Sequence, residues 1–284
     1  MAQGDGIAIR PAGTDAPALG AYAAMLGQVF GPSEKFTPAS LAWRYRDNPA
    51  GPVVGADAWA GETLAAHYVT CPAAMTLEGA RARGLLSLNT ATHPDFQGRG
   101  LFTTLAEATY AAGADAGFDF VFGVANANST PGFVRKLGFQ LVAPLAAGVL
   151  PFPPRRFEIA PVQMAGDWAP EHLAWRLANP AGRYRTATWG ALAGVWARTH
   201  LPVVDCAAFL PAAAGLADQG APPRASLFIG LEPRLALERR MFLALPERFR
   251  PSPLNLIYRP LSPRAPASLD PRQVAVSFLD FDPY

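Results

Sequence analysis

The chain has 284 residues, of which 50% are hydrophobic and 16% are charged, and its formal net charge at pH 7 is +2. This length is enough for one sizeable core or for two domains of ordinary size. The low net charge and mixed composition exclude a disordered tail and a polybasic nucleic-acid-binding protein. We therefore expect a globular protein that binds no nucleic acid.

The sequence shows no targeting or membrane-spanning segment. Asp5 and Arg10 interrupt the apolar residues at the N-terminus, so we expect no signal peptide. The strongly hydrophobic stretch at 140–154 is broken by proline and is shorter than the roughly 20 residues that cross a bilayer. Cys71 and Cys206 are the only cysteines, which is typical of a reducing compartment, and no Cys/His cluster has metal-ligand spacing. We expect a cytoplasmic protein without a metal site or a membrane partner.

Apolar periodicity, capping residues and turn residues predict the elements of the first half in chain order. We expect a strand at 7–10, a helix capped by Thr14 or Asp15, a helix that begins at Pro38 after a Thr37 cap, two strands joined at Gly61, a turn at Glu78-Gly79 followed by a strand at about 84–92, a helix that ends at Gly117, a buried strand at 118–124 and a short helix that stops at Gly138. The segment 150–157 has the composition of a stiff linker. This order predicts a mixed α/β fold.

A glycine-rich loop, QGRG at 97–100, lies between a predicted strand and a predicted helix. Glycines let backbone N–H groups approach a ligand, and a helix that begins near Leu101 adds unpaired donors and a partial positive charge. Such a site suits a pyrophosphate, with Arg99 as a charged contact at its rim. A Walker loop would need a lysine and a hydroxyl residue, and a dinucleotide fingerprint would need three spaced glycines. The remaining option is the pantetheine-pyrophosphate loop of acyl-CoA enzymes.

The segment HPDFQGRGLF resembles motif A of the general-control-related N-acetyltransferases, the GNAT superfamily, usually written Q/R-x-x-G-x-G/A; its last small residue is Phe102 here. NANSTPGFVRKLGF, at 126–139, is similar to motif B, which ends K-x-G-F, and IAIRPAGTDAPAL is similar to the first strand and helix of the family. The resemblance covers about residues 7–145. It implies the GNAT fold, a mixed β-sheet flanked by helices in which two neighbouring parallel strands splay apart.

The resemblance also implies a binding site for acetyl-CoA, or another acyl-CoA, as co-substrate. The main chain of the strand before the loop would pair with the pantetheine arm, the loop would hold the pyrophosphate, and asparagines after the next strand would border the opposite wall or serve only as turn residues. The residues concerned are Thr90, Ala91 and Thr92 for the arm, Gln97, Gly98, Arg99, Gly100, Leu101 and Phe102 for the pyrophosphate, and Asn126 or Asn128 for the wall.

The residues that would protonate the leaving group are not evident. Acyl transfer to an amine needs a neutral amine close to the thioester, a donor for the oxyanion and a leaving thiolate. By resemblance, a backbone N–H near Thr92 is the oxyanion donor. Family members usually protonate the sulfur with a tyrosine of the motif B helix, and this position is Val134 here. Another hydroxyl could replace it, from Tyr45, Tyr68 or the C-terminal Tyr284.

The base is equally open. The strand before the loop offers Ser87 and Asn89, which can order a water molecule but are poor bases. Glu34 lies between the first two predicted helices, where this family lines its acceptor pocket, although the residue type and position favour a solvated loop carboxylate. The candidate catalytic residues are therefore Glu34, Asn89 and Tyr284.

A short repeat links the two halves of the chain. PASLAWRYRDNPAG, at 38–51, and PEHLAWRLANPAG, at 170–182, agree at nine of 13 aligned positions and pair Trp43 with Trp175. Each segment precedes a strand–turn–strand pattern, and FEIAPV upstream of the second echoes IAIRPA. Such self-similarity indicates duplication, with chance as the alternative. The second copy lacks a glycine-rich loop, although SLFIGLEPRLALERRMFLAL, at 226–245, could supply a strand and a helix.

We therefore predict a GNAT acyl-CoA-binding domain at 1–150 and a degenerate, reduced GNAT-like unit at 151–284 that binds no CoA, packs on the first unit and forms part of the acceptor wall. The predicted function is direct transfer of an acyl group, most simply acetyl, from CoA to a primary amine of a small molecule or peptide. The first alternative is a non-catalytic acyl-CoA-binding or regulatory module. A second alternative, an aminoacyl or peptidyl transferase on the same fold, conflicts with the intact motif A. The sequence does not identify the acceptor.

Overall fold

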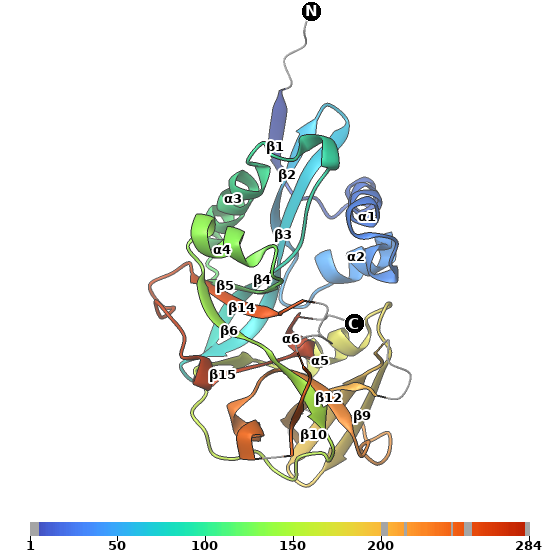
Figure 1. The fold of residues 1–284 in the computed structure, drawn as a ribbon. Helices are drawn as coiled ribbons and strands as arrows, with labels where there is room; N and C mark the ends of the chain where they lie inside the picture. The colour runs from blue at the N-terminus through green and yellow to red at the C-terminus, as the bar shows by residue number, and fades with distance from the viewer. Residues whose placement is uncertain (1–5, 200–203, 213–214, 240, 247–251, 282–284) are drawn as a thin grey trace, which may run out of the picture.

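The structure is a computed structural model that describes residues 6–199, 204–212, 215–239, 241–246 and 252–281. Its ribbon forms two lobes that share one continuous set of paired strands (Figure 1). The first lobe contains β1 (Ile7–Pro11), α1 (Ala16–Phe30), α2 (Pro38–Tyr45), β2 (Val54–Ala60), β3 (Thr63–Leu77), β4 (Ala80–Thr92), α3 (Leu101–Asp115), β5 (Phe120–Ala125), α4 (Thr130–Leu137), β6 (Gln140–Pro144) and β14 (Asn255–Pro260).

The second lobe contains the remaining strands and two short helices. They are β7 (Ala146–Leu150), β8 (Met164–Gly166), α5 (Pro170–Leu177), β9 (Tyr184–Trp189), β10 (Leu192–Ala197), β11 (Cys206–Pro211), β12 (Ser226–Leu231), β13 (Leu243–Ala244), β15 (Val274–Ser277) and α6 (Phe278–Phe281). None of the helices in the described ranges is long and apolar enough to cross a membrane.

The helices of the first lobe begin and end where the capping signals predict. The Asp15 side chain accepts the Ala18 N–H at the start of α1, and the Thr37 hydroxyl accepts the Ser40 N–H at the start of α2. Gly138 ends α4 in the left-handed conformation, at φ +67°. The first-lobe helices thus form from local signals in the sequence.

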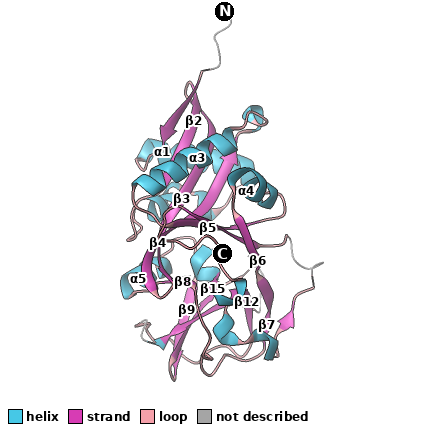
Figure 2. Ribbon diagram, turned by 90° about the vertical axis from the view of Figure 1, so that its left-hand side faces the viewer, coloured by secondary structure: helices cyan, strands magenta, loops and turns pink. Residues whose placement is uncertain are grey.

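The first-lobe sheet is covered on both faces (Figures 1 and 2). Leu86 and Phe122 face the α1 and α2 side, whereas their chain neighbours Leu85 and Val121 face α3 and α4. This alternation follows from the two-residue period of a strand. The central strands are therefore apolar on both sides, which is typical of a sheet between two helical layers.

The parallel strands β4 and β5 separate at the middle of this sheet. They pair only from Gly84 opposite Phe120 to Ser87 opposite Gly123, although β4 continues to Thr92. The other edge of β5 pairs along its whole length with β14, so the gap lies on the β4 side alone. The two strands therefore diverge and leave an open wedge in the first lobe.

Each lobe contains one strand from the other half of the sequence. β14 inserts between β5 and β6 in the first lobe, and β7 pairs with β12 in the second. The lobes also join directly, because β8 pairs with the end of β3. The division at residue 150 stays a prediction, and strand pairing crosses it in both directions.

The second lobe repeats the strand order of the first. The antiparallel strands β9, β10 and β11 are followed by the parallel partner β12, as β2, β3 and β4 are followed by β5. Here, however, the wedge is closed. Gly230 of β12 pairs with β7 on one edge and with Ser277 of β15 on the other, so β15 takes the edge that β11 leaves after Phe228.

The repeated tryptophans meet between the lobes. Trp43 Nε1 donates to the Trp175 carbonyl at 3.0 Å, and Trp175 Nε1 donates to the Trp43 carbonyl at 3.1 Å. Their rings stack with centroids 4.6 Å apart. Each lies on a helix that precedes a hairpin, β2–β3 or β9–β10, so the prediction that the two tryptophans occupy equivalent places is confirmed. The two copies of the motif are packed against each other.

One expectation for the second half is wrong. The strand expected in 226–245 is present as β12, but within the described residues it is followed by two 3-10 turns rather than by a helix. The Glu232 carboxylate accepts the Arg234 N–H and Ala236 adopts φ +46°, so the backbone turns too sharply to continue as an α-helix. In addition, residues 157–162, which echo the segment of β1, form no strand, and the short β8 begins only at Met164.

Candidate functional site

The predicted pyrophosphate loop lies at the N-terminus of α3. Gly98 and Gly100 are exposed, with φ of +75° and +74°, and a Cβ at either would meet open space. Gly100 is the residue before the helix and no side chain caps it. Because Thr103 and Thr104 donate to the Gly100 carbonyl, the N–H groups of the first turn before them point out of the helix. This end of α3 can therefore receive an anion.

The side chains of the loop lie around its rim. The Arg99 guanidinium stacks on the Phe96 ring, 5.0 Å from its centroid, and donates to the Asp95 carbonyl at 3.4 Å. Gln97 is exposed, and its N–H donates to the Pro94 carbonyl. Arg99 thus lies beside the loop, where a guanidinium can contact a phosphate from the edge.

Phe102, the departure from motif A, points into the protein rather than over the loop. Its ring meets Phe133 edge-on with centroids 5.2 Å apart and Tyr68 at 6.1 Å. A Cβ on Gly132 would lie only 3.2 Å from the Phe102 ring, so the glycine lets α4 approach this side chain. Val134 is half-buried on the same helix and has no proton to donate. Phe102 therefore packs between α3 and α4 and leaves the glycine loop open.

The β4 wall of the wedge contains a bulge at Asn89. Val69 pairs with Leu88 and His67 pairs with Ala91, so β4 has one residue more than β3 between these pairs. Asn89 adopts φ +48°, which is uncommon for a residue other than glycine. Thr90 is the second unpaired residue of the bulge, Ala91 and Thr92 pair with His67 and Ala66 of β3, and none of residues 90–92 pairs with β5. Their other edge faces the wedge, as the prediction for the pantetheine wall requires.

The asparagines after β5 form a turn. Asn126 Oδ1 accepts the N–H groups of Asn128 at 3.0 Å and Ser129 at 2.9 Å, just before α4 begins. Both asparagines are exposed. The turn interpretation accounts for Asn126, and contact of either residue with a ligand stays a prediction.

The candidate acid and base residues lie in different environments. Glu34 lies in a 3-10 turn before α2 and is exposed. Tyr284 lies outside the described residues. The Tyr68 hydroxyl lies 2.8 Å from Ser87 Oγ and 2.6 Å from the Tyr110 hydroxyl, at the floor of the wedge, and burial raises the pKa of Tyr68 to about 12. A neutral phenol with that pKa can donate a proton only weakly.

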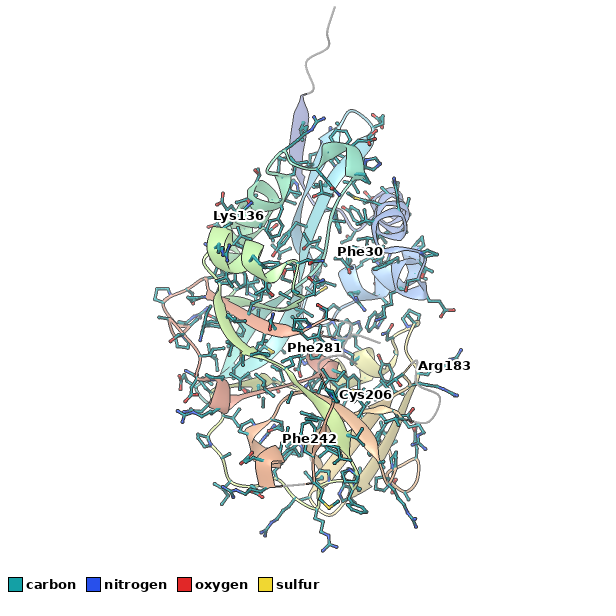
Figure 3. All side chains as sticks on the ribbon, viewed as in Figure 1. Phe30, Lys136, Arg183, Cys206, Phe242 and Phe281 are labelled. Atoms are coloured by element: carbon teal, nitrogen blue, oxygen red, sulfur yellow. The ribbon has the colours of Figure 1, made fainter. Side chains whose placement is uncertain are left out.

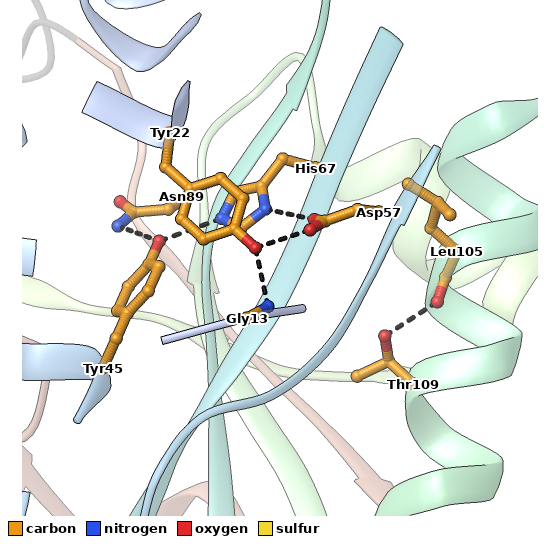
Figure 4. A network of polar contacts seen from close by, with 8 residues as sticks. All are labelled: Gly13, Tyr22, Tyr45, Asp57, His67, Asn89, Leu105 and Thr109. Atoms are coloured by element: carbon orange, nitrogen blue, oxygen red, sulfur yellow. Dashed lines mark hydrogen bonds and ion pairs between the residues drawn. The ribbon is translucent and has the colours of Figure 1, made fainter. Parts of the chain in front are cut away.

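Asn89 and Tyr45 belong to a buried polar network (Figure 4). Asn89 Nδ2 donates to the Tyr45 hydroxyl, which lies 3.1 Å from His67 Nε2; His67 Nδ1 lies 2.7 Å from Asp57 Oδ1. Tyr22 donates to the other Asp57 oxygen and stacks on the His67 ring, with centroids 4.0 Å apart. Burial raises the pKa of the Tyr45 hydroxyl well above its usual value, so it stays protonated.

The site predicted from the sequence did not include Tyr22, Asp57 or His67. The signal was present in the strands themselves, because Asp57 and His67 interrupt otherwise apolar segments that the pattern already predicted to be strands. A charged residue in such a segment is buried only when it has a partner. Their pairing depends on the register of β2 and β3, which places Asp57 opposite His67 and which the sequence alone does not state.

A cavity lies between the lobes, on the α1 and α2 side of the sheet. Leu86 and Leu88 of β4 line it from the first lobe, and α5 and α6 line it from the second. Phe281 of α6, another lining residue, lies where the lobes meet (Figure 3). His172 Nδ1 and Asp280 Oδ1 are buried here and have no hydrogen-bond partner in the described part of the chain. The cavity therefore offers polar atoms to a ligand close to the β4 wall.

Residues 13–142 match the model of a family described as the acetyltransferase (GNAT) domain. The chain contains a GNAT domain. No curated protein is significantly similar to this chain in sequence. In the described residues, no group of three or more His, Cys, Asp or Glu side chains could hold a metal ion.

Solved structures share the fold over most of the chain. A GCN5-related N-acetyltransferase from Anabaena variabilis has TM-score 0.59 and 9% identity, over 90% of this chain and 73% of that chain. N-myristoyltransferase from Saccharomyces cerevisiae with bound myristoyl-CoA has TM-score 0.60 and 8% identity, over 97% and 90%. A putative acetyltransferase from Pyrococcus horikoshii has TM-score 0.54 and 11% identity, over 99% and 98%. This chain spans 40% of a longer probable N-acyltransferase from Enterococcus faecalis.

These findings establish the fold class. The GNAT domain has the expected splayed mixed sheet flanked by helices, and the similarity to whole acyltransferase chains includes the second lobe.

Proposed function

We propose that this protein is an N-acyltransferase that transfers an acyl group, most simply acetyl, directly from acyl-CoA to a primary amine. The observation that carries the proposal is the open wedge beside the uncapped N-terminus of α3. Gly98 and Gly100 leave the helix end open to a pyrophosphate, and the unpaired edge of β4 from Thr90 to Thr92 is available to a pantetheine amide. An extended cofactor arm would complete the hydrogen bonding that the two parallel strands leave unmade.

A short acyl group suits the floor of the wedge. The strands close at Ser87 opposite Gly123, and a Cβ on this glycine would lie 3.3 Å from Ser87 Cβ. The hydroxyls of Tyr68 and Tyr110 also meet here, 2.6 Å apart. Little apolar space is therefore left at the point where a long acyl chain would continue, which supports acetyl over longer donors.

The acceptor would enter through the cavity between the lobes. This cavity borders β4 immediately before the bulge. Two buried atoms in its lining, Asp280 Oδ1 and His172 Nδ1, have no hydrogen-bond partner among the described residues. A carboxylate that lacks a donor favours a ligand with N–H groups. These features support a small molecule or a peptide with a primary amine as acceptor, and the second lobe as part of its binding wall.

The alternative is a non-catalytic acyl-CoA-binding or regulatory module. Val134 favours it, because the position that usually carries the proton-donating tyrosine has no hydroxyl here. A thiol with an ordinary pKa of about 8.5 is nevertheless a fair leaving group without an acid. The intact motif A argues against an aminoacyl or peptidyl transferase that would not use CoA.

The experiment that separates these functions is release of CoA from acetyl-CoA in the presence of a panel of amino sugars, polyamines, amino acids and lysine peptides. The proposal predicts amine-dependent CoA release with at least one class and slower release from myristoyl-CoA. CoA binding without turnover on any amine would instead support the binding module. Faster turnover of myristoyl-CoA than of acetyl-CoA would contradict the proposed donor.

A further inference from the structure

A buried ladder of hydrogen bonds leads from the Asp57 carboxylate to the Asn89 amide (Figure 4). Asp57 is 1% exposed, and His67 and Tyr45 are completely buried. Water does not reach these three side chains, so each polar atom has to find its partner inside the ladder. The direction of one hydrogen bond therefore fixes the direction of the next.

The carboxylate sets this direction. An ionised Asp57 can only accept, so His67 Nδ1 carries the proton and donates it. With that proton on Nδ1, the other ring nitrogen, Nε2, is left to accept the Tyr45 O–H. Since the Tyr45 proton is committed to His67, the Tyr45 oxygen can only accept from Asn89, and Asn89 must present its NH₂ group to it.

The Asn89 side-chain atom that points away from Tyr45 is therefore the amide oxygen, Oδ1. Figure 4 shows the amide nitrogen on the Tyr45 side and the oxygen on the side away from it. Asn89 is half-buried, and Oδ1 accepts no hydrogen bond from the described residues. Asn89 lies in the chain between Leu88, which lines the inter-lobe cavity, and Thr90 of the pantetheine wall, and its φ of +48° takes it out of the regular alternation of β4. Bulges that re-aim one side chain are common beside functional sites.

We propose that Asn89 Oδ1 accepts a hydrogen bond from the acceptor amine, and that Asp57, His67 and Tyr45 are positioning residues that keep this oxygen turned outward. The inference rests on the proposed N-acyltransferase function. A neutral amine carries N–H donors and one lone pair. If Asn89 Oδ1 takes one N–H, the amine is oriented with its lone pair available to the thioester carbonyl.

The direction of the hydrogen bonds in the ladder can be reversed by replacing one carboxylate oxygen of Asp57 with an NH₂ group. In Asp57→Asn, the amide oxygen of residue 57 can still accept from Tyr22, so its NH₂ group faces His67 Nδ1. His67 then carries its proton on Nε2 and donates to Tyr45, and Tyr45 donates to residue 89. The Asn89 amide turns over and presents NH₂ to the amine, so two donors face each other.

A double variant restores the outward acceptor. In Asp57→Asn with Asn89→Asp, Tyr45 donates to one oxygen of the new carboxylate at position 89, and the other oxygen of that carboxylate faces outward. The swap leaves the net charge unchanged. A purely structural network gives no reason for the second substitution to repair the first.

The experiment measures KM and kcat for the best acceptor of the amine panel and for acetyl-CoA, with thermal unfolding as a check on folding. We expect Asp57→Asn to raise KM for the amine at least tenfold with KM for acetyl-CoA unchanged, and the double variant to recover most of this loss. The control is Tyr258→Phe, which removes from β14 a hydroxyl that donates to the Pro266 carbonyl. It should change neither KM. NMR of ¹⁵N-asparagine-labelled protein should show contacts from the Asn89 NH₂ protons to the Tyr45 ring in the native protein only.

The outcomes separate the two proposals. An unchanged KM for the amine in Asp57→Asn, a double variant no better than the single one, or an Asn89 NH₂ group remote from the Tyr45 ring would overturn the positioning role while the acyltransferase function stands. Absence of turnover by the native protein with every amine would overturn the proposed function and this inference with it. If Asp57→Asn fails to fold, Tyr45→Phe gives the same test, because it removes the acceptor that holds the Asn89 NH₂ group.

Discussion

Replacement of Asp280 by asparagine should stabilise the protein more at neutral pH than at acidic pH. The carboxyl is 7% exposed; Oδ2 accepts from the Ser277 N–H at 2.7 Å and from its hydroxyl at 3.2 Å, whereas Oδ1 has no partner in the described residues. Burial raises the pKa of Asp280 from 3.8 to about 6, against the opposing effect of the Ser277 hydrogen bonds and the Arg176 charge. A tenfold change in the proton affinity of the carboxyl is worth about 1.4 kcal/mol of folding free energy. The rise of the pKa from 3.8 to about 6 therefore corresponds to about 3 kcal/mol.

The sign follows from linkage. Because the folded chain holds the Asp280 proton more tightly than the unfolded chain, this stabilisation is complete below pH 3.8 and is lost as the pH rises through about 6. Urea unfolding of both proteins at pH 4.5 and 7.5 should show Asp280→Asn gaining about 2 kcal/mol relative to native between the two values.

A control of opposite sign is available at Asp270, whose pKa is lowered by a hydrogen bond from Arg272, so that its contribution is lost as the pH falls. Asp270→Asn should therefore lose, not gain, relative stability at higher pH. A difference between Asp280→Asn and native that is the same at both pH values would refute the assignment of Asp280 as a buried, partly protonated carboxyl.

Three further experiments test the fold and the loop. Gly98→Ala places a side chain at φ +75°; we expect a stability loss of about 1 kcal/mol by thermal unfolding and about tenfold weaker CoA binding, and undiminished affinity would count against the loop. Trp43→Ala and Trp175→Ala, alone and together, should show a coupling of about 1 to 3 kcal/mol in urea unfolding, whereas strict additivity would deny the stacked pair. Gly230→Ala directs a methyl group at the Val276 carbonyl and should cost about 2 kcal/mol or more, and an unchanged melting temperature would contradict the β12–β15 pairing.

Local signals in the sequence specify the first lobe well. Glycines at 98, 100 and 138, the caps at Asp15 and Thr37, and the apolar runs of the strands each act within a few residues, so they can be recognised without the tertiary structure. The repeated tryptophan motif also predicts the equivalence of α2 and α5.

Features that depend on distant pairing could not be predicted in the same way. β14 enters the first sheet from the far end of the chain, and β15 closes the wedge of the second lobe, yet both are short apolar segments with no local sign of their partner. The Asn89 network has the same origin, because it joins α1, α2, β2, β3 and β4 through register. Asn89 could be selected as a candidate from its strand. Asp57 and His67 could be recognised as polar interruptions of apolar strands, but their pairing with each other depends on the register of β2 and β3.

The central claim is that the open end of α3 binds the pyrophosphate of CoA, and calorimetric titration of CoA tests it most directly. Gly100→Glu brings a carboxylate to the anion site, and Gly190→Glu is the matched control, because Gly190 is an exposed glycine at φ +55° in the β9–β10 turn of the second lobe with the same open surroundings. We predict one CoA site in the native protein, the same affinity in Gly190→Glu, and binding at least a hundredfold weaker in Gly100→Glu, about 2.8 kcal/mol. Equal affinity of Gly100→Glu and native, or no CoA binding by the native protein, would contradict the claim.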